Sequence, residues 1–156
     1  MPDFKDVVIR EARAEDLEAL VAIFASDDKG GHGDTTDPEA FSDYREAFEA
    51  IAASANDTLY VAESDGSIVG TFQTTYSRSL PGRGGANLIL EAVQTHPDCR
   101  GKGIGKTMVQ AAIDEAHIRG CRLIQLMSNA QRTDAHRFYE RMGFRQSHLG
   151  FKMKLK

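Results

Sequence analysis

A basic, glycine-rich segment near residue 100 is the part of this sequence best suited to chemistry. It runs from Arg100 to Lys106, and glycine stands at every second position between those two residues. Glycine tolerates positive φ angles, so such a segment can turn tightly and bring its backbone close to a ligand. Successive N–H groups in such a turn bind anions, and a following helix adds its positive end. The segment therefore predicts a site for a phosphate or diphosphate, with fixed charge from Arg100, Lys102 and Lys106.

Two other phosphate-binding patterns do not fit this segment. The P-loop pattern G-x-x-x-x-G-K-[ST] matches Gly105 to Thr107, but Arg100 occupies the position of its first glycine. The dinucleotide pattern G-x-G-x-x-G also fails, because the glycines here are two residues apart throughout. From the residues alone, a basic turn without a ligand remains the alternative.

One carboxylate could accept a proton. Glu91 stands in the middle of an otherwise apolar stretch from Leu88 to Val93. A carboxylate is costly to bury without a partner, and partial burial would raise its pKa and suit a general base. The alternatives for Glu91 are a solvated strand position or a salt bridge. Tyr139 has apolar neighbours at helical spacing, so periodicity alone favours a core aromatic residue.

Composition disfavours several classes of protein. The formal net charge of −4 and a pI near 5.7 argue against a nucleic-acid binder. The sequence contains no run of about 18 apolar residues, so no membrane span is expected. The charged N-terminal residues do not resemble a signal peptide, so we expect a cytoplasmic location. Cys99 and Cys121 define no disulfide framework, and the five histidines are scattered, so no metal site is expected.

Alternating strands and helices are predicted around the glycine-rich segment. An Asp65-Gly66 turn predicts an antiparallel hairpin, and the strand-helix-strand unit spanning residues 88–127 should be parallel. A mixed α/β sheet with helices on both faces is expected, in the order β-α-α-β-β-β-α-β-α-β. The predicted strands cover residues 7–10, 59–63, 68–76, 88–95 and 121–127, with a last one within 144–155; the helices cover 14–26, 38–55, 103–119 and 133–142.

Two motifs carry a resemblance to a known family. Residues 100–105 fit R-x-x-G-x-G, which resembles the acyl-CoA diphosphate motif of the GNAT superfamily of N-acyltransferases. Residues 135–144 resemble that family's A-x-x-[FL]-Y-x-x-x-G-F helix, and residues 8–17 and 88–97 look like its first strand and helix and its fourth strand. The resemblance implies one GNAT domain over residues 1–156, with a mostly antiparallel sheet.

The resemblance also implies an activity and a set of contacts. It implies transfer of an acetyl group from acetyl-CoA to a primary amine, by direct attack in a ternary complex. Tyr139 matches the family tyrosine that protonates the CoA sulfur, and Glu91 is the candidate base. Arg132 stands where the family often has asparagine, and the nearby Asn129 could take the role of that asparagine. The implied cofactor contacts are Val93, Gln94, Thr95, Arg100, Gly101, Lys102, Gly103, Ile104, Gly105, Lys106, Asn129 and Arg132.

The amine acceptor is expected beside the loop of residues 27–37. This loop carries four carboxylates that would attract a cationic amine, although an acidic surface loop is an equal alternative. A small molecule or a peptide could be the acceptor, and a homodimer is possible. The alternative function is a CoA-binding regulatory module without turnover. The candidate acceptor residues are Asp27, Asp28, His32, Asp34, Asp37, Tyr44, Gln73 and Tyr76.

Overall fold

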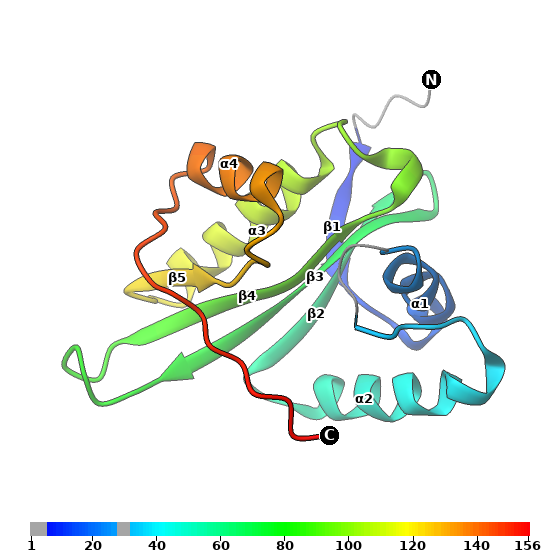
Figure 1. Cartoon of the computed structure of the whole chain (residues 1–156), viewed down its shortest axis with the longest axis horizontal. Helices are drawn as coiled ribbons and strands as arrows, with labels where there is room; N and C mark the ends of the chain where they lie inside the picture. The colour runs from blue at the N-terminus through cyan, green and yellow to red at the C-terminus, as the bar shows by residue number, and fades with distance from the viewer. Residues whose placement is uncertain (1–5, 28–31) are drawn as a thin grey trace.

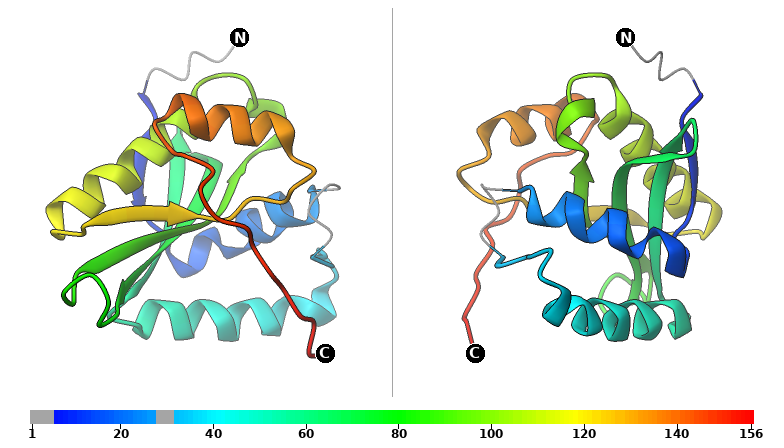
Figure 2. Two further views of the ribbon diagram at one scale, coloured as in Figure 1. Left: turned by 60° about the vertical axis from the view of Figure 1, so that its left-hand side comes forward. Right: turned by 90° about the vertical axis from the view of Figure 1, so that its right-hand side faces the viewer.

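A five-stranded sheet with two helices on each face forms the body of the molecule (Figure 1). The computed structural model describes residues 6–27 and 32–156. Helices α1 and α2 cover one face, and α3 and α4 cover the other (Figures 1 and 2). The strands are β1 (Val8–Glu11), β2 (Asp57–Ser64), β3 (Ser67–Arg78), β4 (Ala86–Thr95) and β5 (Leu123–Leu126); the α-helices are α1 (Leu17–Ala25), α2 (Phe41–Ala53), α3 (Ile104–Ile118) and α4 (Thr133–Arg141).

The strands lie in sequence order, from β1 at one edge to β5 at the other. The first four are antiparallel to their neighbours, and β5 is parallel to β4. Both Asp65 and Gly66 have positive φ angles, which is the geometry of a tight two-residue hairpin turn. The predicted mixed, mostly antiparallel sheet, its hairpin and its parallel unit are therefore confirmed.

Helix α3 packs closely on the centre of the sheet. Its buried residues Met108, Val109 and Ala112 join Phe72 and Leu90 in the main apolar cluster. A Cβ atom on Gly70 would lie only 2.8 Å from the Met108 sulfur, so glycine is needed there for this close approach. Because α3 is held against the sheet in this way, the position of its N-terminus relative to β4 is fixed.

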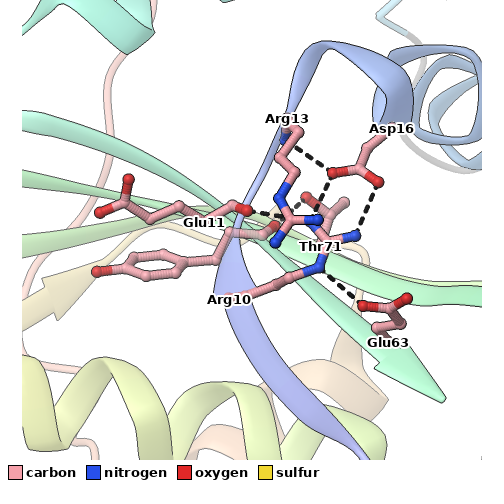
Figure 3. A network of polar contacts seen from close by, with 7 residues as sticks. Arg10, Glu11, Arg13, Asp16, Glu63 and Thr71 are labelled. Atoms are coloured by element: carbon pink, nitrogen blue, oxygen red, sulfur yellow. Dashed lines mark hydrogen bonds and ion pairs between the residues drawn. The ribbon is translucent and has the colours of Figure 1, made fainter. Parts of the chain in front are cut away.

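An arginine-centred network joins β1, β2 and the start of α1 (Figure 3). Arg10 donates two hydrogen bonds to the Asp16 carboxylate, at 2.7 and 2.9 Å, and one to Glu63 at 2.8 Å. Asp16 also accepts the Arg13 backbone N–H. The hydrogen bonds that Arg10 donates lower the pKa of Asp16. The same contacts with Asp16 and Glu63 raise the pKa of Arg10. The network anchors the beginning of the helix whose far end leads to Asp27.

Two predicted elements differ from the structure. The predicted helix at residues 14–26 begins as a 3₁₀ turn, Ala14–Asp16, before α1. The last strand predicted within residues 144–155 is wrong, because this segment is extended but unpaired. A strand exists only when a neighbouring backbone pairs with it, and the tail has no such neighbour in the described part of the chain.

Candidate active site

Strands β4 and β5 separate halfway along β4. They pair only from Asn87 with Leu123 to Leu90 with Leu126. From Glu91 to Thr95, β4 keeps β3 on one side, but no strand of the described ranges lies on the other. This unpaired edge leaves backbone N–H and C=O groups available to an extended ligand, which would bind as an added strand does.

A β-bulge distorts β4 where the two strands part. Ala92 and Val93 together lie opposite Phe72, because the pairing shifts between Gln73 with Glu91 and Thr71 with Gln94. Ala92 has a φ of 52°, which is unusual for a residue other than glycine. The Val93 side chain packs against the main apolar cluster, whereas Ala92 and Gln94 line a pocket. The bulge therefore re-aims the backbone where the edge of β4 becomes free.

The predicted anion segment follows β4 and leads into α3. Gly101 and Gly103 have φ angles of 75° and 82°, and a Cβ atom at either would contact nothing. The need for glycine at these two positions therefore comes from backbone conformation alone. Gly105 differs, because it lies in the first turn of α3, where a Cβ would be 3.6 Å from the Phe138 ring. The expected left-handed turn thus involves two of the three glycines.

The N-terminus of α3 is suited to bind an anion. Its first i→i−4 bond runs from the Thr107 N–H to the Gly103 carbonyl, so the three preceding helical amides have no acceptor within the helix. No side chain caps this end, and its first turn contains no carboxylate. Arg100, Lys102 and Lys106 are exposed around it. The Ile104 side chain is only 1% exposed in the core, so this predicted ligand residue can offer its amide alone.

Tyr139 lies on α4 inside an aromatic cluster. Its ring centroid is 5.2 Å from that of Phe138 and 5.8 Å from that of Phe144. Burial raises the pKa of Tyr139, and the nearby Arg132 partly opposes this rise, so the hydroxyl is protonated at neutral pH. The core packing indicated by periodicity is confirmed, and it holds the phenol in one orientation.

Glu91 is not buried, so of the positions that the sequence left open for it the solvated one is observed. Its side chain is exposed, as is that of Ala92 next to it. The reason is that the apolar run enters the bulge at this point, where β5 no longer lies beside β4. The structure therefore lacks the partial burial that would favour Glu91 as a general base.

A buried carboxylate joins three elements beside the bulge. Asp27 lies two residues beyond α1, and its side chain is 8% exposed. Its Oδ2 atom accepts a 2.6 Å hydrogen bond from Arg132 and a 2.9 Å hydrogen bond from Gln94. Two side chains expected to contact the cofactor therefore bind Asp27. Sequence reasoning missed this cluster, since no local pattern links residues so far apart.

A pocket of about 340 Å³ opens beside this cluster. The Tyr44 hydroxyl donates to Asp34 at 2.8 Å and accepts the Thr35 N–H at 3.1 Å, which holds the loop against α2. The structure thus brings together four of the eight acceptor residues expected from the sequence. The pocket is lined by Asp27, His32, Asp34, Tyr44, Ala92 and Gln94, among others.

Other predicted acceptor residues lie elsewhere. Asp37 caps the turn that precedes α2 by accepting the Glu39 N–H at 3.0 Å. Tyr76 packs under the Arg119 guanidinium, 4.3 Å from its ring centroid, and neither it nor Gln73 lines the pocket. Asp28 lies outside the described residues. Of the expected carboxylates, Asp27 is paired with Arg132 and Asp37 caps a turn.

Asn129 shapes the turn that leads into α4. Its side-chain oxygen accepts the Gln131 N–H at 2.9 Å, and its carbonyl accepts the Arg132 N–H at 3.0 Å.

Over residues 6–27 and 32–156, no three potential metal-ligating side chains come together. Every helix in those same ranges is too short or too polar to cross a bilayer.

Comparison with known proteins places this geometry in a family. The model of the acetyltransferase (GNAT) family matches residues 10–144. Aminoalkylphosphonate N-acetyltransferase from Salmonella typhimurium is 32% identical over 92% of this chain and 88% of its own length. A crystal structure described as a transcriptional regulator from Bacillus halodurans is 41% identical, with a TM-score of 0.92 over 96% of this chain and 100% of that one.

A more distant structure shares the fold. It is described as a "predicted acetyltransferase with acetyl-CoA" from Clostridium acetobutylicum, and it has 20% identity and a TM-score of 0.74 over 96% of this chain and 97% of that one. The family match covers most of the chain, including both sequence motifs and the bulged strand. The chain therefore belongs to the GNAT family of acyl-CoA-dependent acetyltransferases.

Proposed function

We propose that this protein transfers an acetyl group from acetyl-CoA to a small primary amine by direct attack within a ternary complex. The observation that carries the proposal is the unpaired edge of β4 from Glu91 to Thr95. This edge leads to the anion segment at one end, and at the other its bulge lines the 340 Å³ pocket. One strand thus connects a place for a diphosphate with a place for an acceptor.

The residues present fit acetyl-CoA as a co-substrate, which supplies the acetyl group as a reactive thioester. The amides of Gly101 to Lys106, at the positive end of α3, would hold its diphosphate. The free backbone of Val93 to Thr95 would pair with the pantetheine arm. An N–H group at the bulge, from Val93 or Gln94, would donate to the carbonyl oxygen and stabilise its developing charge.

The chain's own groups can complete the transfer. The amine nitrogen attacks the carbonyl carbon, a C–N bond forms, and the C–S bond breaks with its electron pair going to sulfur. Tyr139 would donate a hydrogen bond and a proton to that sulfur, consistent with its protonated state at neutral pH. The proton lost by the amine would pass through a water molecule to the exposed Glu91 carboxylate.

The pocket favours a small acceptor. Its volume of about 340 Å³ suits a small molecule better than a folded surface. Asp34 gives its lining a negative character, which would attract an ammonium group, whereas the charge of Asp27 is balanced by Arg132. The Salmonella relative is named for aminoalkylphosphonates, which carry a primary amine, so these compounds head the acceptor candidates.

A CoA thiol-release assay tests the proposal. The acceptor panel would contain aminoalkylphosphonates, polyamines, amino acids, aminoglycosides and a lysine peptide. We expect saturable thiol release with at least one small amine, matched by the mass of an acetylated product. Tight CoA binding with no thiol release from the whole panel would instead identify a CoA-binding regulatory module.

A further inference from the structure

The segment between β5 and α4 brings an arginine to the unpaired edge of β4. Arg132 immediately precedes α4, and its guanidinium donates to Asp27, two residues beyond α1. Gln94, on the unpaired edge, donates to the same carboxylate oxygen. Figure 2 (left) shows the segment passing beside the end of α1 on its way to α4. The Arg132 side chain is therefore held at the site, and it is only 29% exposed.

Arg132 and Tyr139 lie on the same side of α4. The His136 N–H donates to the Arg132 carbonyl at 3.1 Å, so the helical hydrogen bonds already begin at Arg132. Residues i, i+4 and i+7 share one face of a helix, and long side chains lean toward the helix N-terminus. The Tyr139 side chain therefore leans back toward the turn that carries Arg132.

The Tyr139 hydroxyl is available to a ligand. Within residues 6–27 and 32–156 it makes no hydrogen bond to another protein group. No side-chain polar atom of those ranges is both sealed from solvent and without a partner, so this hydroxyl keeps an opening to the outside. The phenol can therefore donate its proton to a ligand atom without first breaking a contact inside the protein.

Among the described residues, Arg132 is the charged group that acts on this phenol. Phe138 and Phe144 flank the Tyr139 ring, and the buried apolar cluster against which it packs includes the Cys99 thiol but no charged side chain. Burial raises the pKa of Tyr139, and the positive charge of Arg132 opposes that rise. The influence is permanent, because arginine stays protonated at every pH at which a protein is folded.

We propose that Arg132 is a positioning residue for acetyl transfer, and that its fixed charge stabilises the negative charge left on the Tyr139 oxygen. This inference rests on the proposed function. As the C–S bond breaks, its electron pair goes to sulfur, and Tyr139 gives that sulfur its proton. The resulting phenolate then regains a proton from water. Arg132 transfers no proton, but its cation lowers the energy of the charged phenolate, and Asp27 orients that cation.

Fluorine NMR would measure the influence of Arg132 without any substrate. The four tyrosines would be replaced by difluorotyrosine, whose phenol ionises at lower pH than that of tyrosine, and Tyr139→Phe would assign the resonance. We expect the phenol at position 139 to ionise at higher pH in Arg132→Gln, and Arg132→Lys to stay close to the natural sequence. The control is Arg137→Gln, which removes an exposed cation paired with Asp134 on the same helix and should change nothing.

Turnover would measure the catalytic consequence. Arg132→Gln should lower kcat about tenfold at neutral pH, with less than about a threefold change in the KM for acetyl-CoA. The alkaline limb of its kcat profile should move to higher pH, because the phenol keeps its proton longer. Arg132→Lys should keep kcat within about threefold, since lysine supplies the same charge at neutral pH.

A double variant separates charge from packing. Arg132→Gln alone leaves the buried Asp27 carboxylate without its cation, which is costly to the fold. Asp27→Asn combined with Arg132→Gln carries no unpaired charge, and its two amides can still form a hydrogen bond. We expect the same low kcat and the same upward shift of the phenol titration in this double variant.

Three results would overturn the proposal. An active natural chain whose phenol titration is unshifted in Arg132→Gln would overturn this proposal alone. Recovery of the natural kcat in the double variant would also overturn it, by tracing the loss to the unpaired Asp27 carboxylate. A natural chain that acetylates no amine would overturn the proposed function and this proposal together.

Discussion

Arg132 donates a 2.6 Å hydrogen bond to Asp27, although the two residues are 105 positions apart in the sequence. The same carboxylate oxygen accepts a hydrogen bond from Gln94 of β4 at 2.9 Å. Asp27 thus links the end of α1, the bulged strand and the segment before α4. Because Asp27 and Gln94 also line the pocket, this carboxylate positions one wall of the proposed acceptor site.

Asp27→Asn should weaken acceptor binding more than CoA binding. The substitution removes the charge that holds Arg132, so the wall of the pocket loses its anchor. We expect the KM for the amine to rise about tenfold, which corresponds to about 1.4 kcal/mol, with a change of less than about threefold in the KM for acetyl-CoA. Steady-state kinetics with each substrate varied in turn would measure both values.

Asp37→Asn is the matched control for this substitution. It removes the same charge from the same loop, but asparagine can still cap the turn before α2. We expect its amine KM to stay near that of the natural sequence. Equal effects of the two substitutions would show that loop charge matters, rather than the contact between Asp27 and Arg132.

Gly103→Ala should weaken CoA binding selectively. Gly103 has a φ of 82°, and forcing an L-residue into this region costs about 1–2 kcal/mol, so the turn should shift and misalign the amides behind it. Gly120 at the other end of α3 has a φ of 68° and open space around it, so Gly120→Ala carries the same backbone cost. Calorimetry should show about tenfold weaker CoA binding for the first variant alone. A similar loss in both would trace the effect to general strain in α3.

Tyr139→Phe should slow turnover without releasing CoA. Phenylalanine keeps the ring packing against Phe138 and Phe144, but it cannot donate to the leaving sulfur. We expect kcat to fall about 100-fold, as is typical for loss of a general acid, with an unchanged Kd for CoA. Tyr76→Phe, a tyrosine remote from the pocket, should leave kcat intact. A Tyr139→Phe enzyme with full kcat would remove the proposed acid.

The sequence predicts most of this fold because its patterns are local. The helical spacing of Leu17, Leu20 and Val21 predicts α1, and the Asp65-Gly66 pair predicts the hairpin between β2 and β3. The anion segment is also local, since two of its glycines need positive φ angles. The bulge at Ala92 is different, because alanine gives no sign of a left-handed conformation.

Long-range features could not be predicted in this way. The contact between Asp27 and Arg132 depends on how α1 and α4 pack against the sheet. The sequence around either residue does not indicate that the other is its partner. The tail shows the same limit, because its alternating apolar residues predict a strand, but the sequence does not reveal that no described backbone lies beside it. The sequence could not decide between a partly buried and a solvated Glu91, because strand apolarity alone does not reveal where β5 leaves β4.

Acid should selectively remove the contribution of Asp16 to stability. Hydrogen bonds from Arg10 lower the pKa of Asp16 in the folded protein, so its stabilising effect is present above the unfolded pKa of about 3.9. This effect is lost as the pH falls through the lower, folded-state pKa. Asp16→Asn should therefore reduce the free energy of unfolding by about 1–3 kcal/mol at pH 7, and by much less near pH 2.

Urea unfolding across this pH range would measure the difference. Glu18→Gln is the control, because it removes an exposed carboxylate from the same helical region. Its effect should be small at every pH. A constant difference between Asp16→Asn and the natural sequence from pH 7 to pH 2 would contradict the role given to the Arg10 contact.

The central claim is that backbone amides at the start of α3 hold the diphosphate of CoA. Amide NMR of this 17.1 kDa chain during titration with CoA tests that claim most directly. We predict saturable shifts at Gly101, Gly103 and the first turn of α3, with Gly120 at the far end of that helix unmoved. A titration that does not saturate, or saturating shifts that leave residues 101–106 unchanged, would contradict the claim.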